Sequence, residues 1–61
     1  MQSGKNYLRV EDVATKLGLS KSTIRKYVFN KQIPHIKLTA TLLFDEAEID
    51  KWVQDKKVDV Q

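Results

Sequence analysis

A short stretch in the middle of the sequence carries side chains that suit contact with base edges and phosphates. The guanidinium fork of Arg25 can donate two hydrogen bonds to O6 and N7 of a guanine, and the ammonium of Lys26 can read guanine or hold a phosphate. Ser22 and Thr23 are short donors suited to base edges or phosphates, although capping of its own helix is an equal alternative for Thr23. These residue types predict recognition of a nucleic acid rather than a reaction.

The charge is unevenly divided along the 61 residues, whose net charge is +3 at pH 7. Residues 13–44 contain no Asp or Glu, and from Asp45 onward the acidic residues outnumber the lysines. We therefore expect one basic and one acidic surface in the folded chain. A basic surface is typical of proteins that neutralise phosphates, and a merely solvated lysine-rich surface is the alternative. The basic side chains of the acid-free stretch are Lys16, Lys21, Arg25, Lys26, Lys31 and Lys37.

The remaining residue types give little support to a catalytic or metal-binding function. Cysteine is absent, and His35, the only histidine, is better explained as a surface residue than as a metal ligand. The carboxylates fall mainly in one acidic segment without sign of a pocket, so we expect no enzyme, no cofactor and no small-molecule substrate. No apolar run approaches the roughly 20 residues needed to cross a bilayer, and the first residues lack a secretory signal, so we expect a cytoplasmic protein.

Hydrophobic spacing predicts two helices that position these side chains. Apolar residues recur at three- and four-residue intervals from Val10 to Leu17, which indicates a short amphipathic helix that Gly18 ends in the left-handed conformation. Ser20 is a suitable N-cap for a second helix, which we predict over residues 21–31 because Pro34 disfavours helical geometry just before it. A sharp turn around the glycine then joins the two helices.

The second helix has an apolar face and a polar face. At about 100° per residue, Ile24, Tyr27 and Val28 share the apolar face. Phe29 is a large aromatic residue on the polar face, so something should cover it: a thymine methyl, a neighbouring copy or, as the favoured interpretation, packing within the chain near Tyr7. The rest of the polar face is formed by Ser22, Arg25 and Lys26.

Two short apolar runs after Pro34 predict a small β-hairpin. Ile36 and Leu38 alternate with polar residues, and residues 42–44 form the second run. The intervening Thr39-Ala40-Thr41 lacks the Asn-Gly or Asp-Gly pair that marks a tight turn, so the position of the turn stays open.

A closing helix is predicted after the hairpin. Asp45 is expected to cap it, and Glu48, three residues on, resembles the partner residue of a capping box. The spacing of Ile49, Trp52 and Val53 predicts an inward stripe, in which the tryptophan is interpreted as a core residue rather than as a ligand site. A charged tail is expected beyond residue 54.

Three residues set how the first two helices cross. Ala14 is small enough for a close crossing, Gly18 permits the turn, and Ile24 fills the angle where the helices meet; helix-turn-helix units and ordinary helical hairpins both use this pattern. With its flanking segments, the chain resembles the excisionase and MerR-type winged helix-turn-helix domains. The segments that carry this resemblance are residues 7–14, residues 17–24, Ile33-Pro34 and residues 44–52.

This resemblance implies a mainly α fold with a small β-hairpin wing, in the order α-α-β-β-α, and DNA binding by the second helix in the major groove. It also implies a role in excision of a phage or mobile element, or in transcription control. Arg9 stands where the family usually has Ser or Thr, so the first helix lacks a side-chain cap there, but the arginine offers a phosphate contact instead. The wing lacks the Gly and Arg that family members often carry at its tip. The predicted DNA-binding residues are Lys21, Ser22, Thr23, Arg25 and Lys26 of the helix, Lys37, Thr39 and Thr41 of the wing, and Arg9.

We expect one domain over residues 7–54, between a mobile arm of residues 1–6 and a charged tail of residues 55–61. The favoured function is sequence-specific binding of double-stranded DNA as an excisionase-like architectural factor, because so short a chain leaves no effector or dimerisation domain. Its expected partners, besides DNA, are an integrase or recombinase, or further copies of the chain on adjacent sites. The alternatives are a small MerR-like transcriptional regulator and, from another class, a protein-interaction module that contacts an integrase or regulator.

Overall fold

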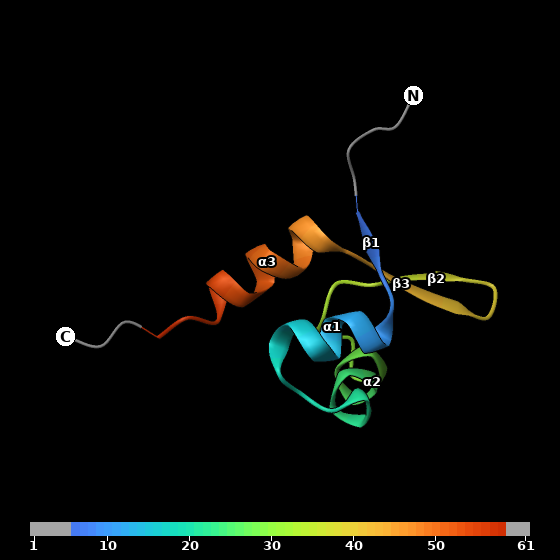
Figure 1. The fold of residues 1–61 in the computed structure, drawn as a ribbon, viewed down its shortest axis with the longest axis horizontal. Coiled ribbons are helices and arrows are strands. Elements are labelled where there is room, and N and C mark those ends of the chain that lie inside the picture. Colours follow the sequence, from blue (N-terminus) through green and yellow to red (C-terminus); the bar gives the residue numbers. More distant parts are fainter. Residues whose placement is uncertain (1–5, 59–61) are drawn as a thin grey trace.

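The structure, a computed structural model, describes residues 6–58, so residues 1–5 of the predicted arm and residues 59–61 of the predicted tail lie outside the described residues. Its elements follow the predicted order of two helices, two strands and a closing helix, with one short strand added at the start (Figure 1). The mainly helical fold with a hairpin wing is therefore confirmed. The elements are β1 (Tyr7–Leu8), α1 (Val10–Leu17), α2 (Lys21–Phe29), β2 (Ile36–Leu38), β3 (Thr41–Asp45) and α3 (Glu46–Asp55).

The first helix, α1, begins and ends at the predicted residues. Arg9 precedes it without a side-chain cap, but the Asp12 carboxylate accepts a hydrogen bond from the Arg9 backbone N–H at 3.0 Å and so holds the first turn. Gly18 follows the helix with φ +69°, a conformation that glycine adopts without steric cost. The backbone N–H of Leu19 then donates to the Ala14 carbonyl at 2.9 Å, which satisfies a carbonyl of the last turn.

The second helix, α2, is shorter than the predicted residues 21–31, because it ends at Phe29. Two residues later Lys31 has φ +56°, a left-handed backbone. The N–H of Gln32 donates to the Tyr27 carbonyl at 2.8 Å across this turn. The chain therefore leaves the helix through a local turn, before the downstream proline could end it.

Three short strands form one antiparallel sheet in the order β1-β3-β2. In its register Leu8 of β1 pairs with Phe44 of β3, and Ile36 of β2 pairs with Leu43 of β3. The strand β1 was not predicted, because two residues are too few to show an alternating pattern. Its pairing places residues 7–8 beside the central strand.

The wing consists of β2, β3 and the turn at Thr39 and Ala40, and it extends from the helical body (Figure 1). Leu38 and Thr41 pair across this turn. Thr39 has φ +54°, which costs a β-branched residue about 1–2 kcal/mol. The turn is therefore two residues long and strained at its first position.

The hydrophobic core lies where the three helices meet β3. Ile24 of α2, Ile49 of α3 and Phe44 of β3 are fully buried. Ala14 is also buried, as the predicted close crossing of α1 and α2 requires. The buried apolar residues are Val10, Val13, Ala14, Ile24, Ile33, Phe44 and Ile49.

The closing helix, α3, is anchored by its tryptophan rather than by a full apolar stripe. Trp52 is half-buried; its indole N–H donates to the Gln32 carbonyl at 2.7 Å, and its ring meets that of Tyr27 edge-on with centroids 5.6 Å apart. The inward position predicted for Val53 is wrong, since this side chain is 38% exposed. The later turns of α3 project away from the sheet (Figure 1), and Val53 borders a hollow there with Leu19 and Lys56.

Candidate nucleic-acid interface

The polar face of α2 points away from the hydrophobic core and from α3. Ile24 is fully buried, and Tyr27 packs against Trp52 of α3, which together define the covered side of the helix. Turning about 100° per residue places the polar residues opposite these contacts. The closing helix therefore leaves them uncovered, and the exposed residues of this face include Ser22, Arg25 and Lys26.

Thr23 and Ser20 form the start of α2. The Ser20 Oγ accepts from the Thr23 backbone N–H at 3.1 Å, which confirms the predicted N-cap. The two hydroxyl oxygens lie 2.9 Å apart and share a further hydrogen bond. The Thr23 side chain thus takes part in capping α2, which was the alternative to a DNA contact. Lys21, in the same turn, is exposed.

A shallow hollow joins the middle of α2 to the wing. It has a volume of about 250 Å³, and its lining brings together Arg9, Arg25 and Thr41. These three predicted site residues come from positions far apart in the sequence. Two arginines and a threonine thus line one depression of the surface, together with the acidic Glu11.

A second hollow, of about 680 Å³, lies between the end of α2 and the wing. Lys37 and Thr39, the other predicted wing residues, line it together with Lys31 and His35. Residues 40 and 42 line both hollows, so this part of the wing lies between them. The wing and the exposed face of α2 therefore border one continuous surface.

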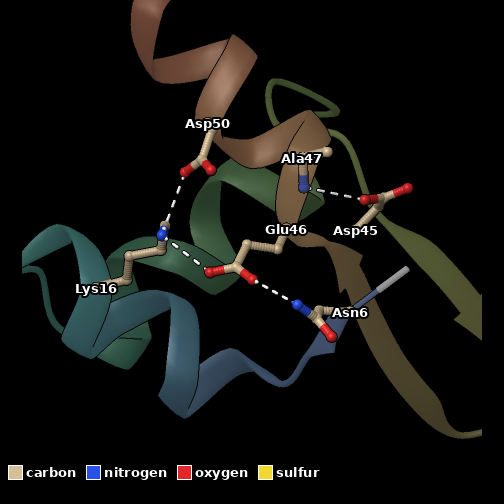
Figure 2. Close-up of polar contacts among 6 residues, drawn as sticks. All are labelled: Asn6, Lys16, Asp45, Glu46, Ala47 and Asp50. Carbon is tan, nitrogen blue, oxygen red and sulfur yellow. Dashed lines mark hydrogen bonds and ion pairs between the residues drawn. The ribbon is translucent and has the colours of Figure 1, made fainter. Parts of the chain in front are cut away.

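One lysine of the acid-free stretch does not belong to that surface. Lys16 points toward α3, where its Nζ lies 3.1 Å from a Glu46 oxygen and 3.2 Å from an Asp50 oxygen (Figure 2). The other Glu46 oxygen accepts a hydrogen bond from the Asn6 side chain at 3.2 Å. The hydrogen bonds that the Lys16 ammonium donates to the carboxylates, first of Glu46 and then of Asp50, raise the pKa of Lys16 above its ordinary value. The expectation that Lys16 contributes to the basic surface is therefore wrong.

The other basic residues of the stretch remain available. They are exposed, and within residues 6–58 they form no ion pair with an acidic side chain. Their charges are therefore not neutralised by the part of the chain that the structure describes. These residues are Lys21, Arg25, Lys26, Lys31 and Lys37.

Phe29 is the residue of this region that sequence reasoning misjudged. Packing within the chain was the favoured interpretation, but the side chain is 85% exposed and lines the second hollow. Its place on the helix was the available signal, since it lies on the same polar face as Arg25 and Lys26. An exposed aromatic residue thus stands inside the cationic surface.

The described residues form neither a metal site nor a membrane span. Residues 6–58 contain no group of three His, Asp or Glu side chains that could hold a metal ion. None of the helices among them is long and apolar enough to cross a bilayer.

A family of known domains shares the pattern of this chain. The family model described as "Helix-turn-helix domain" matches residues 7–57, which include every helix and strand of the structure. No curated protein and no solved structure matches the chain.

Proposed function

Because the chain belongs to the helix-turn-helix domain family and is a DNA-binding protein of that kind, we propose that it binds double-stranded DNA sequence-specifically with α2 in the major groove. The uncovered polar face of α2 is the observation that carries this proposal. An α-helix is about 10–12 Å across with its side chains and fits a major groove about 12 Å wide. The helix can therefore lie in the groove without rearrangement of the core.

The residues of α2 divide into base-reading and phosphate-binding roles. Arg25 reads guanine, because its fork matches O6 and N7 and no acidic side chain of residues 6–58 pairs with it. Lys26 reads a second base or holds a phosphate, and Ser22 contacts a base edge or phosphate near the helix start. Lys21, in the first turn, contacts the backbone of the duplex, where the N-terminal end of the helix also favours an anion.

The wing adds contacts beside the major groove. The first hollow brings Thr41 together with Arg9 and Arg25, so a phosphate there would be attracted by the charges of both arginines, against the repulsion of Glu11. Lys37 and Thr39 border the second hollow and contact the backbone on the other flank. The wing tip carries Leu38, which is 54% exposed, and Thr39 rather than two cationic residues. The tip therefore helps to position the protein on the duplex and adds no charged contact of its own.

We further propose that the protein acts as an excisionase-like architectural factor of a phage or mobile element. Such a factor occupies repeated sites side by side and bends the DNA for a recombinase, and it works by binding alone. It needs a second surface for an integrase or for a neighbouring copy. The exposed acidic residues of α3, which include Glu48, Asp50 and Asp55, are separate from the basic face of α2 and suit this purpose.

One observation favours a different class, the protein-interaction module. A hollow of about 370 Å³ beside α3 is lined mainly by apolar and aromatic side chains. Leu19 and Val53, both partly exposed, belong to it. A module that used this hollow to contact an integrase or regulator would not need the face of α2.

Selection from a pool of random duplexes, followed by footprinting, tests these functions together. Recovery of a defined sequence supports the DNA-binding proposal, and tandem direct repeats support the architectural role. Inverted repeats would indicate a dimeric transcriptional regulator of the MerR-like kind. Absence of binding to any duplex would contradict the DNA-binding proposal and favour the interaction module.

A further inference from the structure

Phe29 lies where α2 would face the bases. Its side chain is 85% exposed, the highest exposure among the large apolar residues that the structure describes. It follows Arg25 by four residues and Ser22 by seven, so all three lie along one stripe of the helix. A helix that presents Ser22 and Arg25 to the major groove therefore presents Phe29 as well.

The surroundings of Phe29 favour an anionic partner. It lines the second hollow with Val28 and Leu42, and Lys31, His35 and Lys37 line the same hollow. No acidic residue lines this hollow, and none occurs between Val13 and Phe44. An apolar ring beside the ammonium groups of Lys31 and Lys37, which form no ion pair within residues 6–58, suits a partner that is negatively charged outside and offers apolar groups within. Duplex DNA has this character, because phosphates border a major groove in which thymine exposes a methyl group.

We propose that Phe29 reads thymine through its 5-methyl group in the major groove. The inference rests on the proposed function and extends it to a second sequence-determining residue besides Arg25. Four residues of helix correspond to about 6 Å, which is close to two base-pair steps. The thymine that Phe29 contacts therefore lies about two steps from the guanine that Arg25 contacts.

Replacement of thymine by deoxyuridine tests this inference, because it removes the methyl group and keeps the base pair. Each thymine of the selected site is replaced in turn, and the affinity of the wild-type protein is measured. One replacement should weaken binding about fourfold, the equivalent of losing one buried methyl group. For Phe29→Ala the same replacement should have no effect, and Phe29→Leu should retain part of it.

Val58→Ala is the matched control, since Val58 is 79% exposed and lies beyond α3, outside the second hollow. This variant should show the wild-type loss at the same thymine. The inference is overturned if the wild-type protein tolerates deoxyuridine at every position, or if Phe29→Ala keeps the full loss. It is also overturned if Phe29→Ala leaves DNA affinity unchanged but abolishes self-association or the binding of an acidic peptide. Failure to bind any duplex would refute the proposed function itself. Normal DNA binding that does not depend on the thymine methyl group would refute only this inference.

Discussion

Removal of one lysine charge should change how DNA affinity depends on salt, and the effect should depend on which lysine is removed. Lys16 and Lys37 come from the same acid-free stretch, but only Lys37 borders the proposed interface. Lys16 is held by Glu46 and Asp50 of α3. The substitutions Lys37→Gln and Lys16→Gln therefore form a matched pair.

The magnitude follows from the exposed lysines of the surface, which are Lys21, Lys26, Lys31 and Lys37. If each neutralises one phosphate, these four lysines alone contribute about −3.6 to the slope of log affinity against log salt. A rise from about 50 to about 200 mM salt then weakens binding roughly 150-fold. Lys37→Gln reduces the slope by about 0.9, so the same rise weakens binding only about 40-fold.

Fluorescence anisotropy with a labelled duplex at several salt concentrations measures these slopes. Lys16→Gln should keep the wild-type slope, and circular dichroism should show that both variants remain folded. A flat salt dependence of the wild-type protein would refute the assignment of the basic surface. Equal losses of slope in Lys16→Gln and Lys37→Gln would show that overall charge, rather than the placement of individual lysines, governs binding.

Three further predictions test the reading helix, the core and the wing. Arg25→Ala should lower the free energy by which guanine is preferred at one position of the selected site by about 1–3 kcal/mol. Recovery of an unchanged site would show that Arg25 does not read a base. Ile24→Ala should lower the free energy of unfolding by about 2–5 kcal/mol and so unfold a large fraction of a domain this small. An unaltered urea transition would contradict the place of Ile24 at the helix crossing. Thr39→Asn should raise the free energy of unfolding by about 0.5–1 kcal/mol, because asparagine tolerates positive φ better. Thr41→Asn, on strand β3, is its control and should not stabilise the protein.

The helix-turn-helix unit could be predicted because its determinants are local. Gly18 and Ser20 act on the backbone within a few residues of themselves, and both adopt the expected roles. The burial of Ala14 and Ile24 follows from their helical spacing. The outward direction of the polar face of α2 was predictable for the same reason.

Features that depend on tertiary contacts could not be predicted in this way. The pairing of Lys16 with Glu46 of α3 joins two residues 30 positions apart in sequence and requires the relative position of α1 and α3. The exposure of Val53 depends on where α3 leaves the sheet, which helical periodicity does not encode. The end of α2 depends on the left-handed turn at Lys31, and lysine gives no signal for that conformation. Phe29 was misjudged because an apolar residue was assumed to need cover from its own chain.

Mapping of the DNA-bound surface by NMR shows whether the polar face of α2 lies against the duplex. A selected duplex is added to isotope-labelled protein, and the changes in backbone and side-chain resonances are assigned to residues. We expect the largest changes at Ser22, Arg25 and Lys26, with further changes along the wing and none on the acidic face of α3. Changes confined to α3, with those three residues unaffected, would contradict this placement of α2.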